Sequence, residues 1–277
     1  PTDNISGTMR AFDPVDSTRA PWNGDTAFGQ MFSQVVFLGR ITAYGSLAGM
    51  FEGCEALTSA DMRGLAVTSS KDVESMFSGC KALRSVRNDA TGDYEAVPTM
   101  PEGAILPASL QPEDASRMLY GCTGLDSVSL TGFATGAEAD LSYMLAGAGA
   151  EGSAFTLVNV GASAPSANLS HMMDGAHASS VELTAVGQGA DADLSYMAAN
   201  STELESVTYA NVGTGAGADA TRAFEGCTSL AEASLANVAI GTSANASYMF
   251  DGCTSLTDVT MAKVASGTNA NLTGMFQ

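Results

Sequence analysis

The sequence predicts a repeat solenoid of about nine coils of 26 residues, with a parallel β-sheet on one face and short helical turns on the other. Two observations support this prediction: a five-residue phrase that recurs at nearly constant spacing, and a strand-like phrase that follows it. Hydrophobic residues make up 45% of the 277-residue chain, so there is material for a core. A single short coil cannot bury its own apolar side, and therefore the coils must stack.

The recurring phrase is Met-Phe-x-Gly-Cys, which we call the anchor. Clear copies occupy residues 50–54, 76–80, 118–122, 223–227 and 249–253. Weaker copies begin at Met144, Met172 and Met197, and Met275 opens a last one. Successive copies are 26, 42, 26, 28, 25, 26, 26 and 26 residues apart. A fixed period of this length indicates a repeat architecture.

Polar residues precede each anchor. An Asp or Asn stands four residues before it, and we expect this side chain to accept hydrogen bonds from backbone N–H groups at a turn. A calcium ladder is the weaker alternative, because the glycine and aspartate spacing of calcium-binding β-rolls is missing. A Ser or Thr two residues before the anchor predicts the N-cap of a short helical turn. The Asp/Asn row comprises Asp72, Asp114, Asp140, Asn168, Asp193, Asp219, Asn245 and Asn271.

The last part of the anchor and the residues after it show two further features. The anchor Gly, replaced once by Asn200, is expected to end the helical turn with a positive φ. Apolar residues then recur in a Leu-x-x-Val-x-Leu-x-x-Val phrase, as in Leu256, Val259, Met261 and Val264. Alternation across Val-x-Leu is the period of a short strand with one buried face.

The 14 Met and five Cys suggest metal chemistry at first, but their positions favour packing. Eight Met lie in the first anchor row, and all five Cys lie in the last. No Cys-x-x-Cys occurs, so we expect no metal site and no cofactor. Buried free thiols are the favoured state of the cysteines, with disulfides between Cys54 and Cys80 or Cys227 and Cys253 as the alternative.

The repeat at residues 248–259, Tyr-Met-Phe-Asp-Gly-Cys-Thr-Ser-Leu-Thr-Asp-Val, resembles that of BspA-like bacterial leucine-rich-repeat surface proteins. The resemblance covers roughly residues 46–277 and implies a leucine-rich-repeat-like stack, display at a cell surface and adhesion. The coils that start at Met144, Met172 and Met197 depart from it, with Ala148, Ala176 and Ser201 in the cysteine row.

The predicted domain organisation has three parts. Residues 1–45 fit the register poorly and contain the only Trp, so we expect an N-terminal cap. Residues 46–277 form the solenoid, which an insertion interrupts at about 87–113. Within it, Asp93, Tyr94 and Glu95 form a candidate binding loop, because insertions in solenoids often lie on the functional face. A degenerate extra coil is the alternative.

Composition excludes several functions. The formal charge of −19 argues against nucleic acid, because phosphate contacts need clustered Lys and Arg. No apolar run is long enough to span a membrane, so we expect no membrane insertion in this segment. Phosphate-binding loops, Gly-x-Ser-x-Gly elbows and a nucleophile–base pair are missing from the sequence, which predicts that the chain is not an enzyme.

The candidate contact residues stand immediately before the anchor. We call them the contact stripe: Arg117, Tyr143, His171, Tyr196, Arg222 and Tyr248. Their amphipathic side chains in one line predict either a binding surface or a shield for the coil edges, and the sequence leaves both open.

The leading hypothesis is an acidic, non-catalytic adhesion or protein-binding module, extracellular or at a cell surface. A host or cell-surface protein, or a glycan, would be its partner. The alternative is a structural spacer in a larger assembly such as a filament, fibre or virion decoration. Because Met275 and Phe276 open a further coil, end-to-end self-association or further domains of the same polypeptide are also expected.

Overall fold

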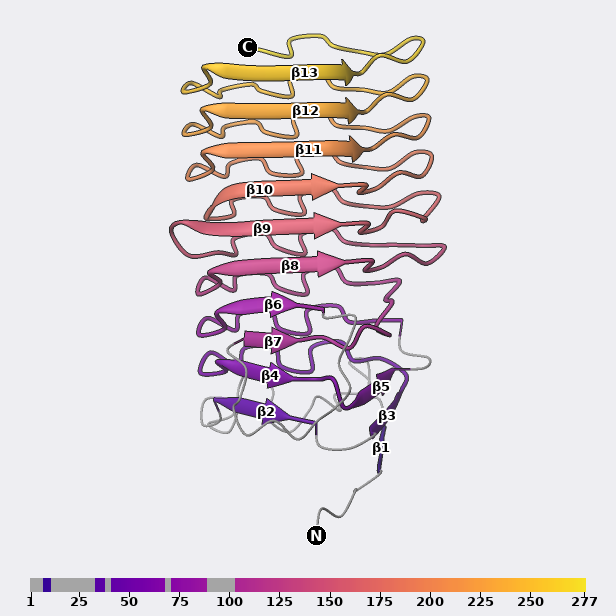
Figure 1. Ribbon diagram of the computed structural model, residues 1–277, viewed down its shortest axis with the longest axis vertical. Coiled ribbons are helices and arrows are strands. Elements are labelled where there is room, and N and C mark those ends of the chain that lie inside the picture. The colour runs from indigo at the N-terminus through magenta and orange to yellow at the C-terminus, as the bar shows by residue number, and fades with distance from the viewer. Residues whose placement is uncertain (1–6, 11–32, 38–40, 68–70, 89–102) are drawn as a thin grey trace.

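The protein is a parallel β-solenoid in its computed structural model, which describes residues 7–10, 33–37, 41–67, 71–88 and 103–277. Bridges along the Asp/Asn row join eight residues, from Asp72 to Asn271, so about eight turns are stacked where about nine were predicted. The turns lie one above another from the N-terminal to the C-terminal end (Figure 1). The repeat solenoid that the sequence predicts is therefore confirmed.

The main sheet is entirely parallel and has ten strands, in the order β13-β12-β11-β10-β9-β8-β6-β7-β4-β2. A second parallel sheet has the order β1-β3-β5. The strands of the main sheet are β2 (Gln34–Val36), β4 (Ser59–Asp61), β6 (Ser85–Arg87), β7 (Gly103–Ile105), β8 (Ser127–Thr131), β9 (Ser153–Val158), β10 (Ala178–Thr184), β11 (Ser206–Val212), β12 (Glu232–Val238) and β13 (Asp258–Val264). Those of the second sheet are β1 (Gly7–Arg10), β3 (Ile41–Tyr44) and β5 (Leu65–Val67).

Equivalent residues of successive coils stack in register. Val181 of β10 pairs with Val207 of β11, which pairs with Ala233 of β12 and then Val259 of β13. Residues on β8 alternate between exposed and buried, so one face of each strand lines the core. Because the same kind of residue recurs at each level, every buried row continues through the stack.

The anchor residues supply the other wall of this core. The eight Met of the first anchor row are all buried, as predicted, and the anchor phenylalanines stack on one another. Ring centroids of Phe51 and Phe77 lie 5.2 Å apart, and those of Phe224 and Phe250 lie 5.3 Å apart. Met261 keeps its predicted inward register opposite Leu235, yet it is 43% exposed because β13 is the outermost strand.

The predicted short helical turns are wrong, since the described residues contain no helix. The reason lies in the backbone hydrogen bonds around each anchor. The N–H of Phe51 donates to the carbonyl of Met76 in the next coil, whereas that of Met50 donates to Leu47 in its own coil. A helix would need local bonds at every residue, but every second N–H is committed to the neighbouring coil.

The Asp/Asn row forms side-chain-capped turns, as the sequence predicts. In each, the Oδ1 atom accepts the backbone N–H two residues later, at 2.9 Å for Asp193 and Ser195. The Ser195 hydroxyl donates to the same oxygen at 2.6 Å. The hydroxyl row was predicted to cap a helix; instead it closes this turn.

Four of the five cysteines are buried, Cys253 is partly exposed, and none of them forms a disulfide. Each thiol beyond the first donates to a carbonyl of the preceding coil, as Cys122 Sγ does to Phe77 at 3.0 Å. Ser201 occupies the same row and makes the same bond, from its hydroxyl to the carbonyl of Met173 at 2.9 Å. Burial raises the pKa of the Cys122 thiol to about 12. The row therefore favours a small side chain, and all of its residues except Ala148 and Ala176 carry a hydrogen-bond donor.

The predicted insertion contributes a strand to the sheet. β7 lies between β4 and β6, out of sequence order (Figure 1). On the opposite side of the coil the row runs directly from Asp72 to Asp114. The insertion thus adds one strand to the sheet but no residue to the Asp/Asn row, which favours a partial extra coil at residues 103–105. Asp93, Tyr94 and Glu95 lie outside the described residues, as does most of the predicted cap at 1–45.

Candidate interaction surface

The contact stripe forms one continuous column on the turn side of the coils. Each of its six residues stands one position before an anchor and has a φ between 53° and 55°. This left-handed conformation costs about 1–2 kcal/mol for a residue with a Cβ. Outside the stripe, small residues occupy the same row: Gly49 and Gly274, which adopt this conformation freely, and Ser75, with a φ of 54°.

Four of the five neighbouring pairs in the stripe stack face to face along the solenoid axis. The rings of Tyr143 and His171 have centroids 4.8 Å apart and planes within 2° of parallel. His171 and Tyr196 are 4.9 Å apart with the same angle. The Arg117 guanidinium carbon lies 5.4 Å from the Tyr143 centroid, and that of Arg222 lies 5.0 Å from the Tyr248 centroid.

Glycine closes this column at the C-terminal end. A Cβ built on Gly274 would lie 2.5 Å from Cε1 of Tyr248, so the tyrosine ring occupies the space that a side chain there would need. The faces of the stripe residues are thus turned toward one another. Their edges remain at the surface, where His171 is 28% and Arg222 is 31% exposed.

Carboxylates flank the stripe, and the sequence analysis missed them. Asp174, Glu225 and Asp251 occupy the variable position of the anchor and form what we call the acidic row. Nδ1 of His171 lies 2.9 Å from Oδ2 of Asp174. Arg222 forms an ion pair with Glu225 and lies 3.8 Å from Oδ2 of Asp251. Their three-residue separation from the stripe was the signal that could have found them.

The stripe also concentrates positive charge. Residues 115–277 contain only three Lys or Arg, at positions 117, 222 and 263, against 15 Asp or Glu. Two of the three lie in the stripe, together with one of the two histidines of the chain. The stripe is therefore a mixed column of donors and cations on an otherwise acidic surface.

The outer face of the main sheet is chemically plainer. Thr208, Ser234 and Thr260 are exposed along one row of β11–β13, with Ala210, Ala236 and Ala262 along the next. Protein hot spots favour Trp, Tyr and Arg, and none of these projects from the two rows. The flat face offers little for tight binding.

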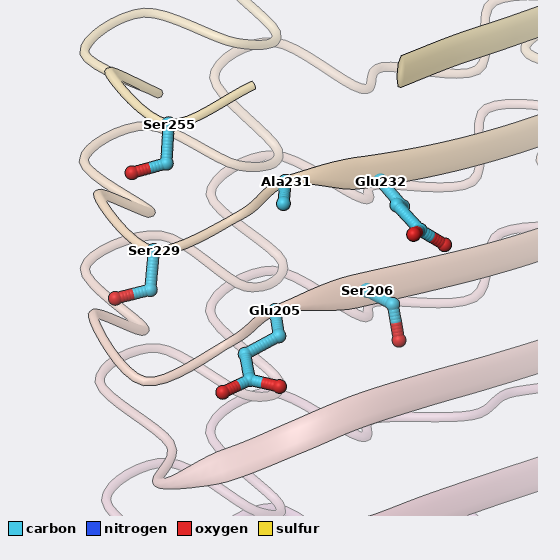
Figure 2. Close-up of a pocket in the computed structure, with 6 residues that line it drawn as sticks. All are labelled: Glu205, Ser206, Ser229, Ala231, Glu232 and Ser255. Atoms are coloured by element: carbon cyan, nitrogen blue, oxygen red, sulfur yellow. The ribbon is translucent and has the colours of Figure 1, made fainter. Parts of the chain in front are cut away.

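A shallow hollow of about 540 Å³ lies where the coils enter β11 and β12. Figure 2 shows its six lining residues, with the carboxylate of Glu205 beside the turn and that of Glu232 on the sheet face. Their carboxyl groups point away from each other in this view, and the other lining residues are serines and an alanine. The hollow thus lacks the convergent groups of a catalytic site.

Among the described residues, no group of three or more His, Cys, Asp or Glu side chains could hold a metal ion. Nor does that part of the chain contain a helix long and apolar enough to cross a membrane. In comparisons with family models, with curated proteins and with solved structures, no match to this chain was found. The resemblance to BspA-like proteins therefore stays a prediction.

Proposed function

We propose that the chain is a non-catalytic adhesion module, secreted or displayed at a cell surface, that contacts its partner through the contact stripe. One observation carries the proposal: bulky Arg, Tyr and His residues occupy a left-handed position that the small residues Gly49, Ser75 and Gly274 fill in the coils beyond the column. The resemblance of the repeat to bacterial surface adhesins adds to it.

The energetics of the stripe support a role beyond folding. Each residue incurs about 1–2 kcal/mol of backbone strain. Stacking of aromatic rings returns about 0.5–1.5 kcal/mol per pair, and an exposed cation–π contact about 0.5–1 kcal/mol. Summed over the six residues, the strain exceeds what the two ring stacks and two cation–π contacts return, so stability alone gives no reason to retain large side chains where glycine suffices. Tyr and Arg are also the residues that dominate binding energy at protein surfaces.

Adhesion can be tested with purified protein and whole cells. Fluorescently labelled wild-type protein should bind target cells, and a Tyr143→Gly, Tyr196→Gly, Tyr248→Gly variant should bind at least tenfold more weakly. A Thr208→Ala, Ser234→Ala variant on the sheet face is the control and should bind as the wild type does. Equal binding by the stripe variant and the wild type would refute the proposal.

A structural spacer in a larger assembly is the second candidate. The observation that favours it is the parallel in-register stacking from β8 to β13, interrupted by one register shift between Ala178 and Ser180 where β10 pairs with β9, which gives equivalent rows at each level. Electron microscopy of purified protein distinguishes the two functions. If the protein forms rods and does not bind cells, the spacer function is favoured and the adhesion function is refuted.

A further inference from the structure

The contact stripe has a regular repeat along the solenoid axis. Its central ring centroids are 4.8 and 4.9 Å apart, and its cation-to-ring distances are 5.4 and 5.0 Å. The column holds six side chains on six consecutive coils. A ligand that engages the whole column must therefore be a linear chain whose groups recur at nearly this spacing.

The atoms that the stripe offers to such a ligand are polar edges. Stacking occupies the ring faces, while the hydroxyls of Tyr143, Tyr196 and Tyr248 make no hydrogen bond to any residue in the described part of the chain. Nδ1 of His171 is held by Asp174, so Nε2 is the nitrogen left for a ligand. Each ring of the stripe therefore presents a polar group at its outer edge, and these groups lie along one line.

Acceptors run beside these donors. The side chains of Asp174, Glu225 and Asp251 are 24%, 30% and 32% exposed and lie against the stripe. A carboxylate accepts hydrogen bonds at both oxygens. A ligand rich in hydroxyl groups, which both donate and accept, would match the two neighbouring rows.

Spacing and charge select among linear polymers. An extended polypeptide advances about 3.3 Å per residue, which does not match the coil spacing. The charge of −19 opposes nucleic acids and other polyanions. A glycan with β-1,4 linkages is extended, and its advance per sugar is close to the coil spacing. Neutral members of this class carry hydroxyl or amide groups on every sugar and encounter no electrostatic penalty.

We propose that the contact stripe and the acidic row bind a neutral, extended β-1,4-linked glycan laid along the solenoid axis, with one sugar facing each coil. This inference rests on the proposed adhesion function, for which it names the ligand class. Six sugars span the column, from Arg117 to Tyr248.

Isothermal titration with cello-oligosaccharides and chito-oligosaccharides of two to six sugars tests this inference. Affinity for one of the two series should rise about fivefold per added sugar, the effect of one net hydrogen bond. Maltohexaose, whose α-1,4 linkages coil the chain, is the matched control and should bind at least tenfold more weakly than the best hexamer. Binding of neither series, or an affinity that does not depend on length, would overturn the inference.

A Tyr143→Phe, Tyr196→Phe, Tyr248→Phe variant isolates the hydroxyl edges, because it keeps the stacked rings. It should retain the wild-type circular dichroism spectrum and bind the hexamer at least tenfold more weakly; unchanged affinity would count against the inference. The cell-binding experiment separates the two proposals. If the Gly variant loses cell binding while neither oligosaccharide binds the wild type, the adhesion function stands and the glycan assignment falls.

Discussion

Substitution of Gly241 by alanine tests how closely the coils approach one another. A Cβ at this position would lie 1.8 Å from the carbonyl oxygen of Gly215 in the preceding coil and 2.7 Å from Cα of Ala216. Both atoms belong to the backbone, so no side-chain rotation can relieve the contact. The same approach recurs at Gly189, Gly215 and Gly267, where the nearest carbonyl oxygen would be 1.9–2.0 Å away.

The size of the expected destabilisation follows from the distance by which alanine would push the two coils apart. A carbon and a carbonyl oxygen come no closer than about 3.3 Å even in favourable contacts, so the two coils would have to move apart by about 1.5 Å. The backbone bond from Gly217 N–H to Thr242 carbonyl, 2.9 Å long, spans this gap and would be lost. We expect Gly241→Ala to lower the free energy of unfolding by about 3 kcal/mol.

The same row contains a matched control. A Cβ on Gly136 would meet nothing closer than Cγ of Glu113 at 3.9 Å, and its φ lies outside the left-handed region. Gly136→Ala should therefore leave the free energy of unfolding within about 0.5 kcal/mol of the wild type. Urea unfolding, followed by circular dichroism, gives both values. If Gly241→Ala unfolds at the same midpoint as Gly136→Ala, the coils do not approach as described.

Three further predictions concern single rows. Tyr196→Ala should destabilise the protein by about 1 kcal/mol more than Tyr196→Gly, because alanine keeps the left-handed strain; an equal or smaller loss for alanine in urea unfolding would contradict this. Asp193→Ala should cost about 1–2 kcal/mol through the lost turn bonds, whereas Asp193→Asn should cost less than half as much, and similar losses would argue against the capped turn. Burial raises the pKa of Cys122 to about 12, so the unfolded thiol ionises first and stability should fall as pH rises from about 9 towards 12. Cys122→Ser, which reproduces the bond of Ser201, should show a smaller fall in urea midpoint between pH 8 and pH 10.5, and an identical fall would refute the assignment.

The sequence was a good guide to the rows of the solenoid. Its 26-residue period placed the anchor Met residues, the cysteine row and the alternating strand residues, and all of these rows line the core except at the outermost strand, β13. Positive φ at the anchor glycines and at Asn200 followed from the same alignment. These features depend on which residue types recur at each position, and sequence contains that information directly.

The sequence was a poor guide to the route of the chain between the rows. A Ser before Met-Phe suits a helix N-cap, and local propensity alone predicts a helical turn there. Hydrogen bonds to the next coil compete for every second N–H, and that competition is not visible in one coil. The place of β7 between β4 and β6 depends likewise on pairing between residues distant in sequence.

For the candidate site, the sequence by itself determined which six residues form the contact stripe, because equal spacing from the anchor puts them in one column. Only the tertiary structure determined how the side chains of that column contact one another and which groups lie beside them. The spacing between coils, close to 4.9 Å at the stripe, brings the planar groups into face-to-face contact and leaves their edges outward. It also places the acidic row beside them. Stacking requires both the left-handed backbone and a neighbour at the right height, and a coil acquires that neighbour only when the solenoid folds.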